Sequence, residues 1–261
     1  MNPLSRQHLK NLRQLQLKKV REETQRFLIE GMRLCEEAAA AGASIEEAVI
    51  DPQALRGARA QRLLARLSSQ GVPLWTTDAI ALQALADTQS PQGIVAIVRK
   101  QPATDFELTS SAASLLLALE GISDPGNLGT ILRSAAWFGV NTVLLSQNAT
   151  ESTNPKVLRS TMGAFFHLDI HEQMDFSALI AAAARAGYRL IAAVAQDGTP
   201  AQQWRPGKRD ILFIGSEARG LPAEWMEQMS LRLTISRHGG GESLNAAIAA
   251  SIMMYQWSVG Q

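Results

Sequence analysis

Residues 115–145 read LLLALEGISDPGNLGTILRSAAWFGVNTVLL, and this stretch decides the fold class. It begins with a run of five apolar residues, 115–119, which is typical of a buried strand. A loop rich in glycine and aspartate follows, and a helical pattern near residues 128–138 then leads into a second apolar run at 142–145. Strand, helix and strand in this order predict two parallel strands joined by a helical crossover.

The same alternation continues to the end of the chain. Further strands are expected at residues 190–194, 211–214 and 231–235, with helices near 155–162, 176–186, 222–229 and 243–257. Strands separated by helices predict an α/β fold with a mostly parallel sheet covered on both faces. Ligands of such sheets bind at the carboxyl ends of the strands, so the loops after Leu119, Ile214 and Ile235 are the candidate site.

A shorter α/β segment precedes this one. Apolar runs near residues 27–29, 48–50, 72–75 and 94–98 alternate with helical patterns, and a polar stretch at 101–111 then breaks the alternation. We therefore predict a smaller amino-terminal α/β domain at 1–100, a linker at 101–111 and a larger domain at 112–261.

The charge composition restricts the partners of the chain. The 25 basic side chains are nearly balanced by 24 acidic ones, so attraction to nucleic acid must come from local clustering. Residues 1–21 provide such a cluster, a basic helix without any acidic side chain, in which the basic residues are Arg6, Lys10, Arg13, Lys18, Lys19 and Arg21. A solvated helix face is the alternative interpretation.

Cys35 is the only cysteine, which excludes an intramolecular disulfide and a thiolate-based zinc site. No apolar run is long enough to span a bilayer, and the basic amino terminus lacks the apolar core of a signal peptide. We therefore expect a cytoplasmic protein with no membrane contact and no metal.

Three loops carry the residues that could do chemistry. In the first, we expect Asn127 to cap a helix that begins near Leu128, with Arg133 about one and a half turns further along and facing the same crevice. The second loop has Gly215 and Gly220, which permit close approach of the backbone to a ligand, and Glu217 between them. The third loop leads through three glycines to Ser243, Leu244 and Asn245, of which Ser243 is the expected helix cap.

Each loop also has a purely structural interpretation, as a helix cap, a strand-to-helix connection or a glycine hinge. None contains a Walker phosphate loop or the Gly-x-Gly-x-x-Gly pattern of a dinucleotide site. Glycine-rich loops after strands still suit a nucleotide-like ligand that is held by backbone groups without a phosphate cradle. S-adenosylmethionine fits that description.

In order and spacing, the three loops resemble the motifs of the SpoU (TrmH) family of RNA 2′-O-ribose methyltransferases, within the SPOUT superfamily. The first matching segment is Asp124-Pro-x-Asn127-x-Gly129-x-x-x-Arg133, the second is Gly215-x-Glu217-x-x-Gly220, and the third is Ile235 followed by Ser243-Leu244-Asn245. Ser236 and Arg237 depart from the family, whose members usually have Pro and Met there.

Two further segments resemble family members. Residues 26–31, RFLIEG, followed by a helix, are similar to the ribosomal-protein-like RNA-binding domain attached to many of the ribosomal RNA enzymes. Lys156, Arg159 and Gly163 resemble the family's stretch between its first two motifs.

The resemblance implies a trefoil-knotted methyltransferase domain, a homodimer, S-adenosylmethionine as cofactor and large-subunit ribosomal RNA as substrate. It also implies that Gly215, Ile235 and Leu244 contact the cofactor. The catalytic residues it implies are Arg133, Asn127, Glu217, Ser243 and Asn245, with Arg133 of one subunit brought towards the cofactor of the other.

A sulfonium methyl group is already activated, so catalysis has mainly to align the ribose hydroxyl and stabilise the oxyanion that develops. Because a guanidinium is effectively always protonated in proteins, we expect Arg133 to bind the adjacent phosphate and the emerging alkoxide rather than to remove the proton. Two alternatives are a non-catalytic RNA-binding protein that keeps the fold and a transfer RNA ribose methyltransferase.

Overall fold

The computed structural model describes residues 1–101, 106–108, 115–216, 218–241 and 243–260. Its contacts divide the chain into two compact units: unit 1 comprises Met1–Pro102 and Thr153–Phe166, and unit 2 comprises Ala103–Ser152 and His167–Gln261. Most of the predicted linker at 101–111 lies outside the described residues. The predicted domain boundaries therefore stay predictions.

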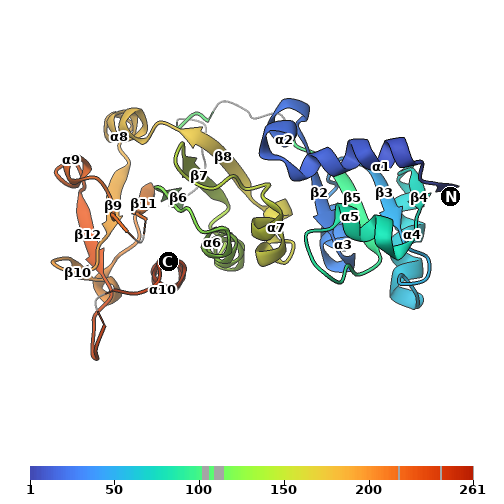
Figure 1. The fold of residues 1–261 in the computed structure, drawn as a ribbon. Coiled ribbons are helices and arrows are strands. Elements are labelled where there is room, and N and C mark those ends of the chain that lie inside the picture. Colours follow the sequence, from blue (N-terminus) through green and yellow to red (C-terminus); the bar gives the residue numbers. More distant parts are fainter. Residues whose placement is uncertain (102–105, 109–114, 217, 242, 261) are drawn as a thin grey trace. The chain divides into compact units, whose positions relative to one another are not determined.

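Unit 1 is built on a five-stranded sheet in the order β1-β4-β3-β5-β2 (Figure 1). The outer strand β2 and the strand β3 both run antiparallel to β5, whereas β4 is parallel to its neighbours. The strands are β1 (Asn2–Pro3), β2 (Arg26–Glu30), β3 (Ile45–Ile50), β4 (Leu74–Thr76) and β5 (Ile94–Arg99). The helices are α1 (Arg6–Arg13), the 3-10 turn η1 (Gln14–Gln16), α2 (Lys18–Thr24), α3 (Met32–Ala40), α4 (Ala58–Ser69) and α5 (Ala79–Leu85).

The two faces of this sheet carry separate cores, as the alternation of side chains along a strand requires. On β5, Ile94 and Ala96 pack with α3 and α4, whereas Val95 and Ile97 pack with α1 and α5. Both faces are therefore covered by helices, and all of these strand residues are fully buried.

Unit 2 holds a seven-stranded sheet in the order β10-β12-β9-β11-β6-β7-β8 among the described residues. Every pairing in it is parallel, so the prediction of a mostly parallel α/β sheet is confirmed. Its strands are β6 (Leu115–Leu119), β7 (Thr142–Ser146), β8 (Asp169–Met174), β9 (Arg189–Ala193), β10 (Thr199–Pro200), β11 (Asp210–Ile214) and β12 (Leu231–Thr234). Its helices are α6 (Pro125–Trp137), α8 (Phe176–Arg185), the 3-10 turn η3 (Ala201–Gln203), α9 (Ala223–Met226) and α10 (Ala246–Val259).

Sequence patterns located the central strands but not β8. The central strands β6, β7 and β11 are buried along their whole length, as expected for parallel strands covered on both faces. Strand β8 reads DIHEQM and lies at the edge of the sheet, where charged side chains are common because one side of the strand is unpaired. Because its sequence is polar, β8 was not predicted as a strand.

Helix α7 (Pro155–Thr161) and the 3-10 turn η2 (Ala164–His167) follow β7 and precede β8, both strands of unit 2. Residues 153–166 nevertheless group with unit 1. In the described part of the chain, no helix has the length and apolar character needed to cross a membrane.

Candidate active site

A cavity of about 470 Å³ lies in unit 2 beyond the carboxyl ends of β9, β11 and β12. Its volume falls in the usual range for small-molecule sites. The lining comes from four segments: residues 193–195 at the end of β9, the end of β11 with the Gly215 loop, the glycine-rich loop 235–241 after β12, and the first turns of α10 with the residues just before them. Of the predicted cofactor contacts, Gly215, Ile235 and Leu244 all line this cavity.

The loop after β11 folds back on its own backbone. Ser216 and Gly220 form a β-bridge, and the Gly220 N–H donates a hydrogen bond to the Ser216 carbonyl at 2.9 Å. A Cβ atom at position 215 would lie 2.2 Å from the carbonyl carbon of Gly220, so no side chain fits there. The close approach of the loop's own backbone therefore requires glycine at 215. From the sequence, this glycine was instead attributed to the close approach of a ligand. Glu217 lies outside the described residues.

The loop after β12 is braced by Arg237, one of the two residues that depart from the family pattern. A guanidinium nitrogen of Arg237 donates a hydrogen bond to the Gly241 carbonyl at 2.6 Å and so spans the glycines between them. Both Ser236 and Arg237 line the cavity. The departure therefore supplies a local support for the loop.

Asn245, and not Ser243, caps α10. Its side-chain oxygen accepts hydrogen bonds from the N–H groups of Ala247 and Ile248 at 2.9 and 3.3 Å. Ser243 is instead exposed and lines the cavity. The expected cap at Ser243 was wrong because both residues have cap-forming side chains, and the helix begins later than predicted.

Asn127 is likewise not a cap. Helix α6 begins at Pro125, and the Asp124 carboxylate caps it by accepting a hydrogen bond from the Asn127 N–H at 2.8 Å. This leaves the Asn127 side chain to accept a hydrogen bond from the side-chain amide of Asn245 at 3.0 Å. The first and third motifs, 118 residues apart in the chain, are thus joined by two amide groups.

Arg133 is not brought to the cavity of its own chain. It is exposed on α6 and does not appear among the residues that line the cavity. Within the described parts of the chain, its side chain has neither a hydrogen-bonding nor an ionic partner. The expectation that it faces the same crevice is therefore not met within one chain.

Several lining residues were not anticipated. Ala193 ends β9, and Val194 and Ala195 follow it; the sequence predicted this strand but gave no reason to expect site residues at its end. Ala249 and Met253 come from α10, where spacing along the helix would have placed them on the face that Ala246 shares.

Comparisons with known proteins decide the family. The model of the SpoU rRNA Methylase family matches residues 114–255, and that of the MRM3-like substrate binding domain matches residues 6–96. The chain belongs to the SpoU rRNA Methylase family. It is 29% identical over 249 residues to a 23S rRNA guanosine 2′-O-methyltransferase of Bacillus subtilis, with 95% of each chain covered.

Two further similar proteins match nearly the whole chain. An uncharacterized tRNA/rRNA methyltransferase of Synechocystis is 33% identical over 255 residues, which are 98% of this chain and 90% of the relative. The crystal structure of an rRNA methyltransferase from Sinorhizobium meliloti with bound S-adenosylmethionine is 26% identical, with a TM-score of 0.84 and coverage of 98% and 96%.

The cavity of this SpoU-family chain fits S-adenosylmethionine, the ligand bound in the Sinorhizobium meliloti structure. Its lining contains backbone from two glycine-bearing loops and the apolar side chains of Ile235, Leu244 and Met253. Arg237 and His238 are the only lining residues, among those described, with ionisable side chains. Such a lining suits an adenosine group that carries no phosphate.

Proposed function

We propose that this SpoU-family enzyme methylates a ribose 2′-hydroxyl of large-subunit ribosomal RNA, with S-adenosylmethionine as methyl donor. The observation that carries the proposal is the cavity, which is built from the second and third motif loops and tied to the first motif by the contact between Asn127 and Asn245. The B. subtilis relative, named for 23S rRNA 2′-O-methylation, and the match to the SpoU rRNA Methylase family both support a ribosomal substrate.

When bound, S-adenosylmethionine supplies a methyl group that its sulfonium already activates. The chain must then hold a ribose hydroxyl in line with it and stabilise the negative charge that develops on the oxygen. We assign that charge stabilisation to Arg133, which also binds the neighbouring phosphate. Asn127 and Asn245 keep the first and third loops in register, and Ser243 lies at the wall of the cavity to contact the substrate.

Since Arg133 does not reach the cavity of its own chain, we propose that a second copy of the chain supplies it. Helices α6 and α10 pack together, with the Ser134 and Ser251 hydroxyls 2.7 Å apart. Large apolar side chains are exposed on both helices: Trp137 of α6 is 84% exposed, and Ile248, Tyr255 and Val259 of α10 are each about half exposed. These three α10 residues share one helix face, and large apolar surfaces of this kind mark association sites.

The resemblance to the SpoU family leads us to propose a trefoil knot in unit 2, and the cysteine content leads us to propose a cytoplasmic location. Buried Cys35 and the absence of any other cysteine from the sequence are consistent with a reducing compartment.

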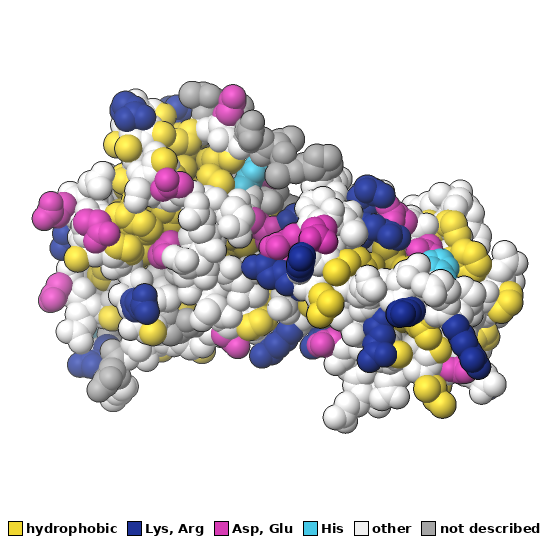
Figure 2. All heavy atoms as spheres, turned by 45° about the horizontal axis from the view of Figure 1, so that its top comes forward, with side chains coloured by type: hydrophobic (Ala, Val, Ile, Leu, Met, Phe, Trp, Pro, Cys, Tyr) yellow, Lys and Arg dark blue, Asp and Glu magenta, His cyan; other side chains and the backbone are white. Residues whose placement is uncertain are grey.

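We assign RNA capture to unit 1, and in particular to α1. Arg6, Lys10 and Arg13 are all exposed, and their spacing of four and three residues places them on one helix face. Figure 2 shows Lys and Arg side chains on the face of this unit that is turned to the viewer.

The other three basic residues of the amino-terminal segment have partners within the protein. Lys18 and Lys19 pair with Glu22 and Glu23 at 3.6 and 3.8 Å. Arg21 is buried and donates hydrogen bonds to the carbonyls of Leu15 and Gln16 at 2.9 and 2.8 Å. The RNA-binding cluster therefore narrows from six side chains to three.

An unmodified transcript of large-subunit ribosomal RNA, incubated with labelled S-adenosylmethionine, tests the proposal. We expect label on a ribose, seen as one linkage resistant to alkaline hydrolysis, and no comparable labelling of transfer RNA transcripts. Arg133→Ala should lose turnover by about a hundredfold or more while calorimetry shows unchanged cofactor affinity, because its role is confined to the reaction.

The matched control is Arg185→Ala, which removes another exposed arginine from unit 2 and should behave as wild type. Label on a base would contradict ribose methylation. Turnover that survives in Arg133→Ala would remove this residue from the mechanism.

A further inference from the structure

The segment Thr153–Phe166 belongs by sequence to the methyltransferase part of the chain and by contacts to unit 1. It follows Ser152 and precedes His167, both of unit 2, so it is covalently tied to that unit at both ends. It also lies between the first and second motifs, each of which carries site residues.

Apolar packing anchors this segment in unit 1. Leu158 of α7 is 1% exposed and lies in the core cluster that contains Phe27 of β2 and Leu34 of α3. Phe165 packs edge-on against Phe27, with ring centroids 5.6 Å apart. These contacts place α7 in the core of the unit and not merely on its surface.

Gly163 shows how closely the segment fits. Its φ of +100° disfavours any side chain, and a Cβ atom there would lie 2.4 Å from Cγ of Glu37 on α3. The chain therefore passes α3 at a distance that only glycine permits.

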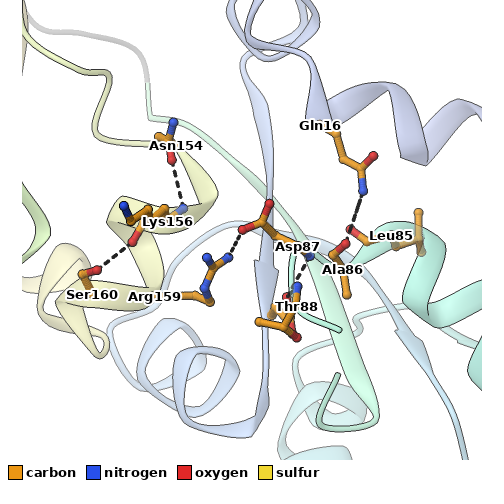
Figure 3. Close-up of polar contacts among 10 residues, drawn as sticks. Gln16, Leu85, Ala86, Asp87, Thr88, Asn154, Lys156, Arg159 and Ser160 are labelled. Carbon is orange, nitrogen blue, oxygen red and sulfur yellow. Dashed lines mark hydrogen bonds and ion pairs between the residues drawn. The ribbon is translucent and has the colours of Figure 1, made fainter. Parts of the chain in front are cut away.

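An ion pair adds a directional contact to this packing. Arg159 of α7 pairs with the Asp87 carboxylate, and Figure 3 shows the two side chains pointing toward each other. The backbone at Asp87 is itself held, because the N–H groups of Asp87 and Thr88 donate to the Glu30 carboxylate on β2 at 3.0 and 3.3 Å. Arg159 is thus fixed to a supported point of unit 1.

We propose that Arg159 is a positioning residue for methyl transfer, which acts through its ion pair with Asp87 to fix α7 on the RNA-binding unit. The inference rests on the proposed function. Apolar contacts hold α7 in place but tolerate small rotations, whereas an ion pair with a supported carboxylate selects one orientation. Since α7 continues at both ends into the methyltransferase unit, a change in its orientation on unit 1 would change how RNA captured by that unit meets the site.

Four variants test this role: Arg159→Gln, Asp87→Asn, the exchange of both charges in Arg159→Asp with Asp87→Arg, and the control Arg59→Gln. The control removes a different ion pair of the same unit, that between Arg59 and Glu36, in which no residue of α7 takes part. Each is assayed for kcat and KM on the ribosomal RNA transcript, RNA Kd by filter binding, and cofactor Kd by calorimetry.

We expect kcat to fall about tenfold to a hundredfold in Arg159→Gln and Asp87→Asn, because small misplacements of a substrate are costly. A partly exposed ion pair contributes little to stability, so both single variants should remain folded. We therefore expect the RNA Kd and the cofactor Kd to stay within about twofold of wild type. The charge exchange should recover most of kcat, and the control should match wild type. Unchanged kcat in the single variants, or a failure of the exchange to restore it, overturns the proposal.

A second measurement does not depend on activity. Spin labels on cysteines introduced at Ser69 of unit 1 and Ala181 of unit 2, both exposed, report the distribution of distances between the units by pulsed electron resonance. We expect a distribution that is narrower in wild type than in Arg159→Gln and narrow again after the charge exchange. Equal widths in all three overturn the positioning role, whereas unmethylated RNA with the wild-type enzyme overturns only the proposed function.

Discussion

At the scale of single residues, Cys35 of α3 is fully buried in unit 1. Burial raises the pKa of its thiol to about 12, the negative charge of Glu36 adds to the rise, and a backbone hydrogen bond at Ala96 opposes it. A thiol in this state is a poor nucleophile, because the thiolate is the reactive form.

We expect Cys35 to resist disulfide-exchange reagents at pH 8 in the folded protein and to react fully once the chain unfolds. A colorimetric thiol assay measures both, and Ala40→Cys, exposed on the same helix, is the control that should react at once. Since the folded pKa lies above the ordinary value of 9.0, this residue favours folding below pH 9 and loses that contribution as the pH rises towards 12. Rapid labelling of the native wild-type protein would contradict the burial.

The sequence placed several candidate residues in loops that line the cavity, but it did not predict the local structural role of each one. Gly215, Ile235, Ser243 and Leu244 all reach the cavity, as strand-end loops of a parallel sheet should. The caps were misassigned, because Asp124, Asn127, Ser243 and Asn245 all have side chains able to cap a helix. Only the observed helix starts decide among them.

At the scale of elements, α1 carries a prediction for RNA binding. Replacing Arg6, Lys10 and Arg13 together by glutamine should weaken RNA binding and lower the slope of log Kd against log salt by about two units, since each phosphate contact contributes about 0.7 to 0.9. Filter binding over a range of salt concentrations measures this slope.

Lys18→Gln with Lys19→Gln is the control, because these side chains already pair with glutamates on α2. It should leave the slope unchanged. If the control lowered the slope of log Kd against log salt equally, the RNA contacts would involve the whole amino-terminal segment, and the assignment to α1 would be contradicted.

Some helices and strands could be predicted from the sequence more reliably than others. Buried central strands such as β6 and β11 are nearly continuous apolar runs, so the sequence correctly predicted them to be strands. Strand β8 and the two-residue β10 lie at the edges of the sheet and lack such a signal. The core to which α7 belongs could not be predicted either, because Leu158 and Phe165 indicate that the segment is buried but not against which partner.

At the scale of the whole molecule, a site completed by a second chain predicts complementation. We combine Arg133→Ala, which keeps the cavity, with Ala195→Trp, which fills the cavity from an exposed lining position and keeps the arginine. With random exchange about half of the dimers are mixed and each mixed dimer regains one of two sites, so activity should return to about a quarter of wild type.

Mass spectrometry of the intact assembly confirms that mixed dimers have formed. Ala195→Trp is preferred to a substitution at Gly215, where any side chain would collide with the loop backbone and could unfold it. No recovery of activity in proven mixed dimers would show that each chain builds its site alone.

Unit 1 is built from two separate segments of the chain, and this limits how domains can be exchanged between such enzymes. Residues 6–96 match a domain model of their own, which invites the transfer of this segment between relatives as a unit. A chain cut at Ser111 would, however, leave Leu158 and Phe165 without the core they fill, and a transplanted domain would meet a foreign α7. A successful graft must therefore include residues 153–166. Substitutions on β2 or α3 that change this packing surface must also be compensated by substitutions in residues 153–166, a segment far downstream in the gene.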